Sequence, residues 1–150
     1  MKEKVAEVYL KLGEVGLESE NYPQGIDDFK KCLDIQESIL QNDNRCIAET
    51  HYQLGSAYSF CDEFDLAIES FSAAVNVLEL RISNLEKLQK EKEQWTEEQK
   101  HQDAATKPDP FYTEQGEIDE INKLLPEIRE KIVDMKQMKI DSQERMKAAK

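Results

Sequence analysis

Carboxylates and large apolar side chains recur at intervals of three and four residues in two separate segments of the sequence. Because this spacing follows the turn of an α-helix, each set is expected on a single helical face. Carboxylates on such a face give charge-assisted hydrogen bonds to Lys or Arg of a partner, and aromatic side chains beside them supply contact area. The first set consists of Glu7, Leu10, Glu14, Leu17 and Glu18, with Glu20 just beyond it, and the second of Glu49, Tyr52, Ser56, Ser59 and Phe60.

No Lys or Arg occurs at these positions. We therefore predict an acidic groove that binds a basic, partly apolar helix or peptide. The net charge of −12 agrees with a basic partner and disfavours direct binding of nucleic acid, which needs a basic surface. The alternative is that these acids only form a solvated helix surface. The predicted binding residues are Glu14, Leu17, Glu18, Glu20, Glu49, Tyr52, Ser56 and Phe60.

Side chains that commonly catalyse reactions are few and scattered. His51 stands where a large packing residue is expected and is interpreted as a core histidine. The three cysteines show neither metal-ligand spacing nor even pairing, so we expect reduced thiols. No nucleophile with an adjacent base, phosphate-binding loop or metal cluster is recognisable in the sequence. The sequence therefore predicts a protein that is not an enzyme and uses no cofactor or metal.

The two acidic segments belong to two copies of a longer pattern. Gly13 and Phe29 in the first copy correspond to Gly55 and Phe71 in the second. A glycine at this place lets two helices approach closely, and the phenylalanine fills the space between them. The pattern resembles the tetratricopeptide repeat, whose ideal period is about 34 residues. The copies lie about 42 residues apart, which predicts an extended second helix in the first repeat.

The first copy departs from the repeat pattern at two positions. Gly16 and Gly25 occupy the places where the second copy has Tyr58 and Ala67. Cys32 likewise stands where the second copy has a small alanine, so its thiol is expected to pack between helices.

The sequence predicts an all-α fold, a tetratricopeptide-repeat solenoid of two helix pairs with a long extended helix and a long C-terminal capping helix. The alternative for the long helices is a coiled coil between two chains, which leaves a homodimer open. Helices are expected over 4–19, 24–41, 45–60, from about 65 to at least 94, and 117–149. The single domain, 1–150, divides into a first repeat over 4–42, a second repeat with an extended second helix over 45–101, a loop over 102–116 and a capping helix over 117–149.

No stretch approaches the roughly 20 apolar residues of a membrane span, so no membrane partner is expected. The chain opens inside a helical pattern without a capping residue. Because repeat arrays usually hold about three repeats, we expect a piece of a longer solenoid.

Three segments are more specific than the general repeat pattern. LKLGEVGLESENY, AETHYQLGSAY and LLPEIREKI resemble the nuclear autoantigenic sperm protein family of histone chaperones. This resemblance implies binding of histone H3, with or without H4, and of linker histone H1. It also implies passive shielding and transfer of histones without ATP, and residence in the nucleus as well as the cytoplasm.

The family's H3-binding positions correspond here to Glu14, Glu18, Glu20, Glu49 and Tyr52. Ser56 is a departure, since it stands where a family member carries leucine. The family also has earlier repeats and a long acidic insertion that this sequence lacks. Weaker H3 binding is therefore expected, and loss of H1 binding through that insertion.

Two other functions are consistent with the repeats. The first is a cargo or scaffold adaptor resembling the repeats of kinesin light chains, although the asparagine pairs typical of those grooves are missing. The second is a helical scaffold that associates with itself through its long helices. Repeats that bind an acidic C-terminal tail use Lys, Arg and Asn in the groove. Here Glu14 and Ser56 stand at the matching places, so an acidic tail is expected to be repelled.

Overall fold

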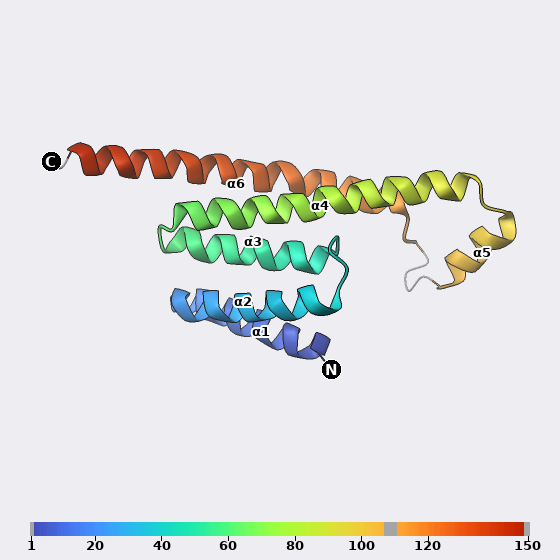
Figure 1. The fold of residues 1–150 in the computed structure, drawn as a ribbon, viewed down its shortest axis with the longest axis horizontal. Helices are drawn as coiled ribbons and strands as arrows, with labels where there is room; N and C mark the ends of the chain where they lie inside the picture. Colours follow the sequence, from blue (N-terminus) through green and yellow to red (C-terminus); the bar gives the residue numbers. More distant parts are fainter. Residues whose placement is uncertain (1, 107–110, 149–150) are drawn as a thin grey trace.

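Helices make up nearly all of the computed structural model, which describes residues 2–106 and 111–148. The chain packs as a row of antiparallel helices (Figure 1). The all-α prediction is confirmed, with helices in repeat-like pairs and a long last helix. None of the helices in the described ranges is long and apolar enough to cross a membrane. The helices are α1 (Lys2–Glu18), α2 (Tyr22–Ile39), α3 (Arg45–Phe60), α4 (Phe64–Glu93), α5 (Glu97–Thr106) and α6 (Glu114–Ala148).

The first pair, α1 and α2, is held at an unusually short distance by glycine. A Cβ atom built on Gly13 would lie 2.5 Å from the ring of Phe29, which is fully buried. A Cβ atom on Gly16 would lie 2.9 Å from the Cα atom of Gly25. The two glycines that depart from the repeat pattern therefore face each other, and the two backbones meet where the second repeat places larger side chains.

The second pair, α3 and α4, packs as the repeat pattern predicts. Phe71 lies against Gly55, where an added Cβ atom would meet the ring at 2.9 Å. Tyr58, Ala67 and Ala74 are all buried in the core between the helices. The residue types that identified the repeat thus occupy the positions that hold its two helices together.

The two pairs join through a buried polar contact as well as apolar packing. The hydroxyl of Thr50, on α3, donates a hydrogen bond of 2.6 Å to Oε1 of Gln36, on α2. The Cys32 sulfur lies 3.8 Å from the same hydroxyl, and burial raises the pKa of this thiol. Because these groups satisfy each other inside the core, they fix the position of α3 on α2.

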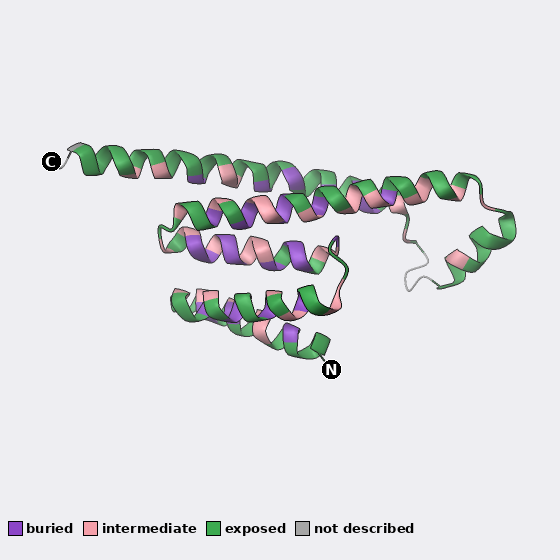
Figure 2. Ribbon diagram, in the orientation of Figure 1, coloured by how far each residue is buried: buried purple, intermediate pink, exposed green. Residues whose placement is uncertain are grey.

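The long helix α6 runs antiparallel to α4 and covers it with an apolar stripe. Ile121, Leu125 and Ile128 of α6 are buried with Leu78 and Leu85 of α4. Figure 2 shows the buried residues of α6 on the side that faces α4. Pro126 lies inside α6 without ending it.

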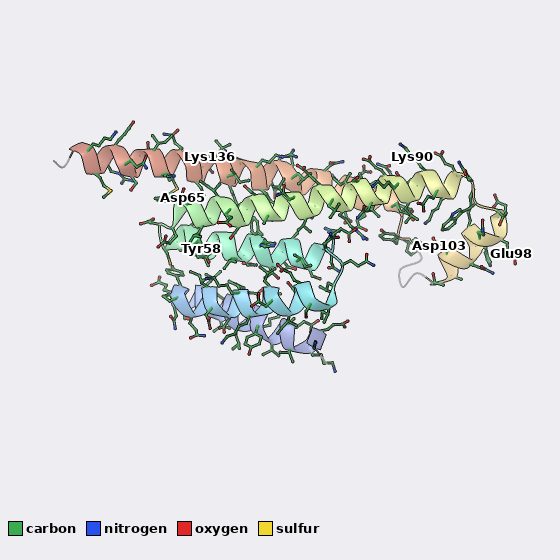
Figure 3. All side chains as sticks on the ribbon, viewed as in Figure 1. Tyr58, Asp65, Lys90, Glu98, Asp103 and Lys136 are labelled. Carbon is green, nitrogen blue, oxygen red and sulfur yellow. The ribbon has the colours of Figure 1, made fainter. Side chains whose placement is uncertain are left out.

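Beyond its contact with α4, the C-terminal part of α6 extends past the end of the helix pairs. Lys139 pairs with Asp65 in the first turn of α4, with the ammonium 2.6 Å from the carboxylate. Figure 3 shows Asp65 at this end of α4, with α6 continuing beyond it. Ile140 and Met146 are exposed on this extension.

The predicted loop over 102–116 is wrong at both ends. The extended helix α4 ends at Glu93, and the separate helix α5 runs to Thr106. The last helix begins at Glu114, where the Thr113 hydroxyl accepts a hydrogen bond from the backbone N–H of Gly116 and caps the helix. The part of the predicted loop over 107–110, and the last predicted helical residue at 149, lie outside the described residues.

A polar cluster ties three distant parts of the chain together where α6 begins. The guanidinium of Arg81, on α4, donates two hydrogen bonds of 2.9 and 3.0 Å to the carboxylate of Glu117, on α6. It also donates a 3.4 Å hydrogen bond to Asp43, in the connection between α2 and α3, and the Asn84 amide donates to the same carboxylate at 2.9 Å. We call this group, completed by the Tyr112 hydroxyl that donates to Glu117, the Arg81 cluster.

Candidate binding groove

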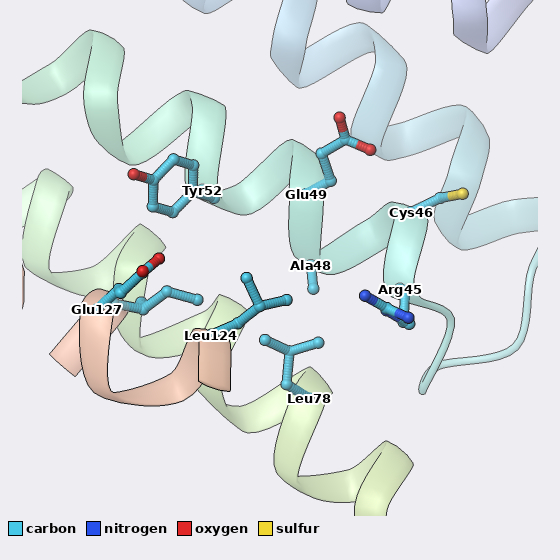
Figure 4. A pocket seen from close by; sticks show the side chains of 9 residues that line it. Arg45, Cys46, Ala48, Glu49, Tyr52, Leu78, Leu124 and Glu127 are labelled. Carbon is cyan, nitrogen blue, oxygen red and sulfur yellow. The ribbon is translucent and has the colours of Figure 1, made fainter. Parts of the chain in front are cut away.

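Between α3 and α6 the structure leaves a cavity of about 630 Å³, with α4 as its floor. The side chains of Ala48, Leu78, Leu124 and Ile128 make its interior apolar, while charged side chains stand around them (Figure 4). The cavity exists because α3 and α6 pack on the same helix, α4, and face each other across it. The full lining consists of Arg45, Cys46, Ala48, Glu49, Tyr52, Leu78, Leu124, Glu127 and Ile128.

Tyr52 stands at one end of this cavity and is half-buried. Its ring meets the Phe71 ring edge-on, with 5.5 Å between the ring centroids, so packing in the core fixes its orientation. From α6, the ammonium of Lys131 lies 5.7 Å from the centroid of the Tyr52 ring. The tyrosine is thus a rigid wall of the cavity.

The carboxylates at the rim come from both walls of the cavity. Glu49 projects from α3 and Glu127 from α6, and both are exposed. Burial raises the pKa of the Cys46 thiol, and the carboxylates of Glu49 and Glu7 raise it further. Glu7 of α1 therefore acts on the same thiol as Glu49, while the nearby cation of Arg45 acts in the opposite direction and lowers its pKa.

The predicted residues of α1 do not line this cavity. Glu14 is partly exposed and lies 3.7 Å from Lys11, so the cation on its own helix partly neutralises it. Leu17 is partly buried against the core. Glu18 and Glu20 are exposed, and Glu20 lies beyond the helix with a positive φ of 62°.

The last two predicted residues of α3 differ from Tyr52 in their surroundings. The Ser56 hydroxyl donates a 3.1 Å hydrogen bond to the carbonyl of Tyr52, within its own helix. Phe60 stacks on Tyr22 at the start of α2, with 5.3 Å between ring centroids, and is 58% exposed. It lies two turns past Tyr52 and does not line the cavity. Of the eight predicted residues, Glu49 and Tyr52 are the ones that the cavity brings together.

Sequence reasoning missed the wall that α6 contributes. The apolar stripe read from the sequence of α6 treated Leu124 and Leu125 alike. In the structure, Leu124 is 38% exposed and lines the cavity, whereas Leu125 is buried in the core. Sequence reasoning also missed two cations at the groove, Lys131 over Tyr52 and Arg45 at the start of α3. Arg45 lies 3.2 Å from Glu120 of α6, so its charge is paired. The indication of this wall in the sequence was the segment LLPEIREKI, in which Glu127 follows Leu124 by about one helical turn.

Comparison with known proteins follows the two repeats. Residues 6–43 match the family described as SHNi-TPR, and residues 48–77 match a tetratricopeptide repeat. Nuclear autoantigenic sperm protein of Homo sapiens is 47% identical over 88 residues, which is 59% of this chain and 11% of that protein. This chain belongs to the nuclear autoantigenic sperm protein (SHNi-TPR) family. The resemblance inferred from the sequence is therefore confirmed.

Other relatives extend the similarity within this family along most of the chain. Protein HGV2 of Halocynthia roretzi is 42% identical over 134 residues, 89% of this chain and 24% of that protein. Histone-binding protein N1/N2 of Xenopus laevis is 46% identical over 79 residues, 53% of this chain and 13% of that protein. The chain thus spans a quarter or less of the length of these family members.

Proposed function

We propose that this chain is a histone-binding module that holds histone H3, alone or with H4, along an acidic groove that runs from the cavity between α3 and α6 onto the exposed acids of α1. The observation that carries the proposal is the cavity with an apolar interior and the carboxylates of Glu49 and Glu127 on opposite walls. A Xenopus laevis relative is described as a histone-binding protein. Histones are basic proteins, and carboxylates such as those of Glu49 and Glu127 pair with their Lys and Arg side chains.

The proposed mechanism is passive. Carboxylates along the groove accept charge-assisted hydrogen bonds from Lys and Arg of the histone, and the net charge of −12 speeds the encounter. While the groove holds a basic segment, that segment is kept from DNA. No ATP is required, because release follows from competition for the same basic groups. The proposed location is the nucleus, with a further pool in the cytoplasm.

The test is a titration of the whole chain with fluorescent peptides that tile the C-terminal region of histone H3, at two salt concentrations. The variant reverses two charges on α1, Glu14→Lys with Glu18→Lys. A matched control reverses Glu97 and Glu98 on α5, a helix with no buried residues. Hydrogen bonds to charged groups contribute about 1.5–3 kcal/mol each, so the α1 variant is expected to bind at least 10-fold more weakly.

The control variant makes the result specific. We expect it to bind within about threefold of the natural chain, because general attraction between exposed charges is weak and screened by salt. Equal losses in both variants would mean that overall acidity, and not the groove, attracts the peptide. Absence of saturable binding to any H3 peptide would overturn the proposed function. Linker histone H1 added in the same assay tests the second partner.

A further inference from the structure

We propose that the cavity between α3 and α6 is a two-part pocket, which takes one bulky apolar side chain of the bound segment together with a neighbouring Lys or Arg. The apolar side chain fills the interior, and the cation lies at the rim between Glu49 and Glu127. The inference rests on the proposed function and makes α6 the wall that selects the sequence of the bound segment.

The size and lining of the cavity support the apolar half of this pocket. A volume of about 630 Å³ lies within the range of about 300–1,000 Å³ of natural ligand sites. Leu124 faces it while remaining 38% exposed, although the neighbouring Leu125 is fully packed. An apolar side chain seated against Leu124 and Leu78 would remove this surface from water, which favours binding.

The charges at the rim support the cationic half. In the part of the chain that the structure describes, no ion pair is found for Glu49 or Glu127. The nearby cations are engaged elsewhere, since Arg45 pairs with Glu120 and Lys131 lies over the Tyr52 ring. A Lys or Arg from a partner would therefore meet two carboxylates that form no ion pair with the described residues of this chain.

The position of Arg45 orients the bound segment. Arg45 lies at the opposite end of the cavity from Tyr52 and Glu127 (Figure 4). A cation on the bound segment is therefore favoured near Glu127, whereas at the other end the nearest carboxylate outside the cavity, that of Glu120, is already paired with Arg45. The pocket distinguishes a segment with its basic residue on one side of the apolar side chain from the reverse order.

The experiment uses the H3 peptide that binds most tightly in the titration above. Glu127→Lys and Leu124→Ala change the α6 wall, and Glu130→Lys is the matched control, because Glu130 is exposed on the same helix and does not line the cavity. We expect Glu127→Lys to weaken binding at least 10-fold, Leu124→Ala about 10-fold, and Glu130→Lys less than threefold. Circular dichroism confirms that each variant is folded.

Cysteine alkylation gives a second readout that does not depend on the variants. Cys46 is exposed at the rim of the cavity, whereas Cys61 lies at the other end of α3. A bound peptide is expected to slow maleimide labelling of Cys46 at least fivefold and to leave Cys61 unchanged.

The outcomes separate the two proposals. If the Glu14 and Glu18 variant loses the peptide while Glu127→Lys behaves like Glu130→Lys and Cys46 stays reactive, the groove binds histone but the pocket proposal is wrong. If no H3 peptide binds, both proposals fall. If Glu127→Lys binds weakly and Cys46 is protected, exchanging the basic and apolar residues of the peptide should abolish the protection, and its persistence would overturn the predicted order.

Discussion

The close approach of α1 and α2 predicts a measurable penalty for one added methyl group. In Gly16→Ala the new Cβ atom would lie 2.9 Å from the Cα atom and 3.0 Å from the N atom of Gly25, and 3.2 Å from the carbonyl oxygen of Asn21. All three are backbone atoms, so no side-chain rotation can relieve the contacts and the two helices must separate.

Two opposing terms set the size of the effect. Overpacking of this kind typically costs about 1–3 kcal/mol, whereas alanine in place of glycine inside a helix contributes about 1 kcal/mol. Because the added methyl group contacts backbone atoms, we expect a steric cost in the upper part of this range of about 1–3 kcal/mol. The free energy of unfolding of Gly16→Ala is therefore expected to fall by about 1–2 kcal/mol.

The assay is urea unfolding followed by circular dichroism at 222 nm, with Gly25→Ala as the matched variant. At Gly25 the added Cβ atom would meet one backbone atom at 3.1 Å, the carbonyl oxygen of Gly13, and its next contacts are at 3.6 and 3.7 Å. At Gly25 the same gain in helix propensity is offset by a smaller steric cost. We therefore expect the change in the free energy of unfolding of Gly25→Ala to be near zero. A Gly16→Ala variant at least as stable as the natural chain would refute the close backbone contact.

Three further measurements test other parts of the fold. Arg81→Met removes the partner of the buried Glu117 carboxylate, so the stability loss should approach the ~3–5 kcal/mol typical of a broken buried pair. Hydrogen bonds from Arg81 lower the pKa of Glu117. The stabilisation from this pair is therefore fully present above about pH 4.3, the pKa of an unfolded Glu, and is lost as the pH falls through the folded pKa. The free energy of unfolding of Arg81→Met should consequently depend less on pH in acid than that of the natural chain. Ile121→Ala, at a fully buried site on α6, should cost about 2–5 kcal/mol in thermal unfolding, and a loss below about 1 kcal/mol would contradict the docking of α6. Burial lowers the pKa of His51 from 6.5, so its imidazole resonances should titrate below that value, and stability should decline as the pH drops below 6.5 because the unfolded chain takes up the proton more readily.

The packing inside each repeat could be predicted because particular residue types have particular mechanical roles. Gly55 beside Phe71, and Gly13 beside Phe29, identify helix pairs in which an aromatic ring fits against a bare backbone. The meeting of Gly16 with Gly25 was not foreseen, because each was noticed only as a departure at its own position. Sequence offsets within one helix do not reveal which residue stands opposite.

Helix α5 was missed for a different physical reason. It has no buried residues, so no apolar period marks it in the sequence. A local signal was present, since the Thr96 hydroxyl accepts from the backbone N–H of Gln99 and the Gln99 side chain accepts from that of Thr96. This reciprocal pair is a capping box, which signals a helix start without any apolar stripe.

The candidate groove could be predicted only where it belongs to a repeat. Glu49 and Tyr52 follow from their place in α3, whereas Glu127 comes from a helix outside the repeat pattern. Its position depends on how α6 docks on α4, which is decided by packing between segments far apart in the chain. Phe60 has the spacing of the groove face but stacks on Tyr22, because it is near the end of α3.

The docking of α6 on α4 also has a consequence for the order of synthesis. A ribosome adds Leu85, on the apolar face of α4, about 40 residues before it adds Leu125, on the apolar stripe of α6. At about 5–20 residues per second, this face stays bare for roughly 2–8 s. During that interval the α4 of one nascent chain is open to the α6 of another, a route to domain swapping. Codons that slow translation after Glu93 should therefore raise the yield of exchanged dimers relative to monomers.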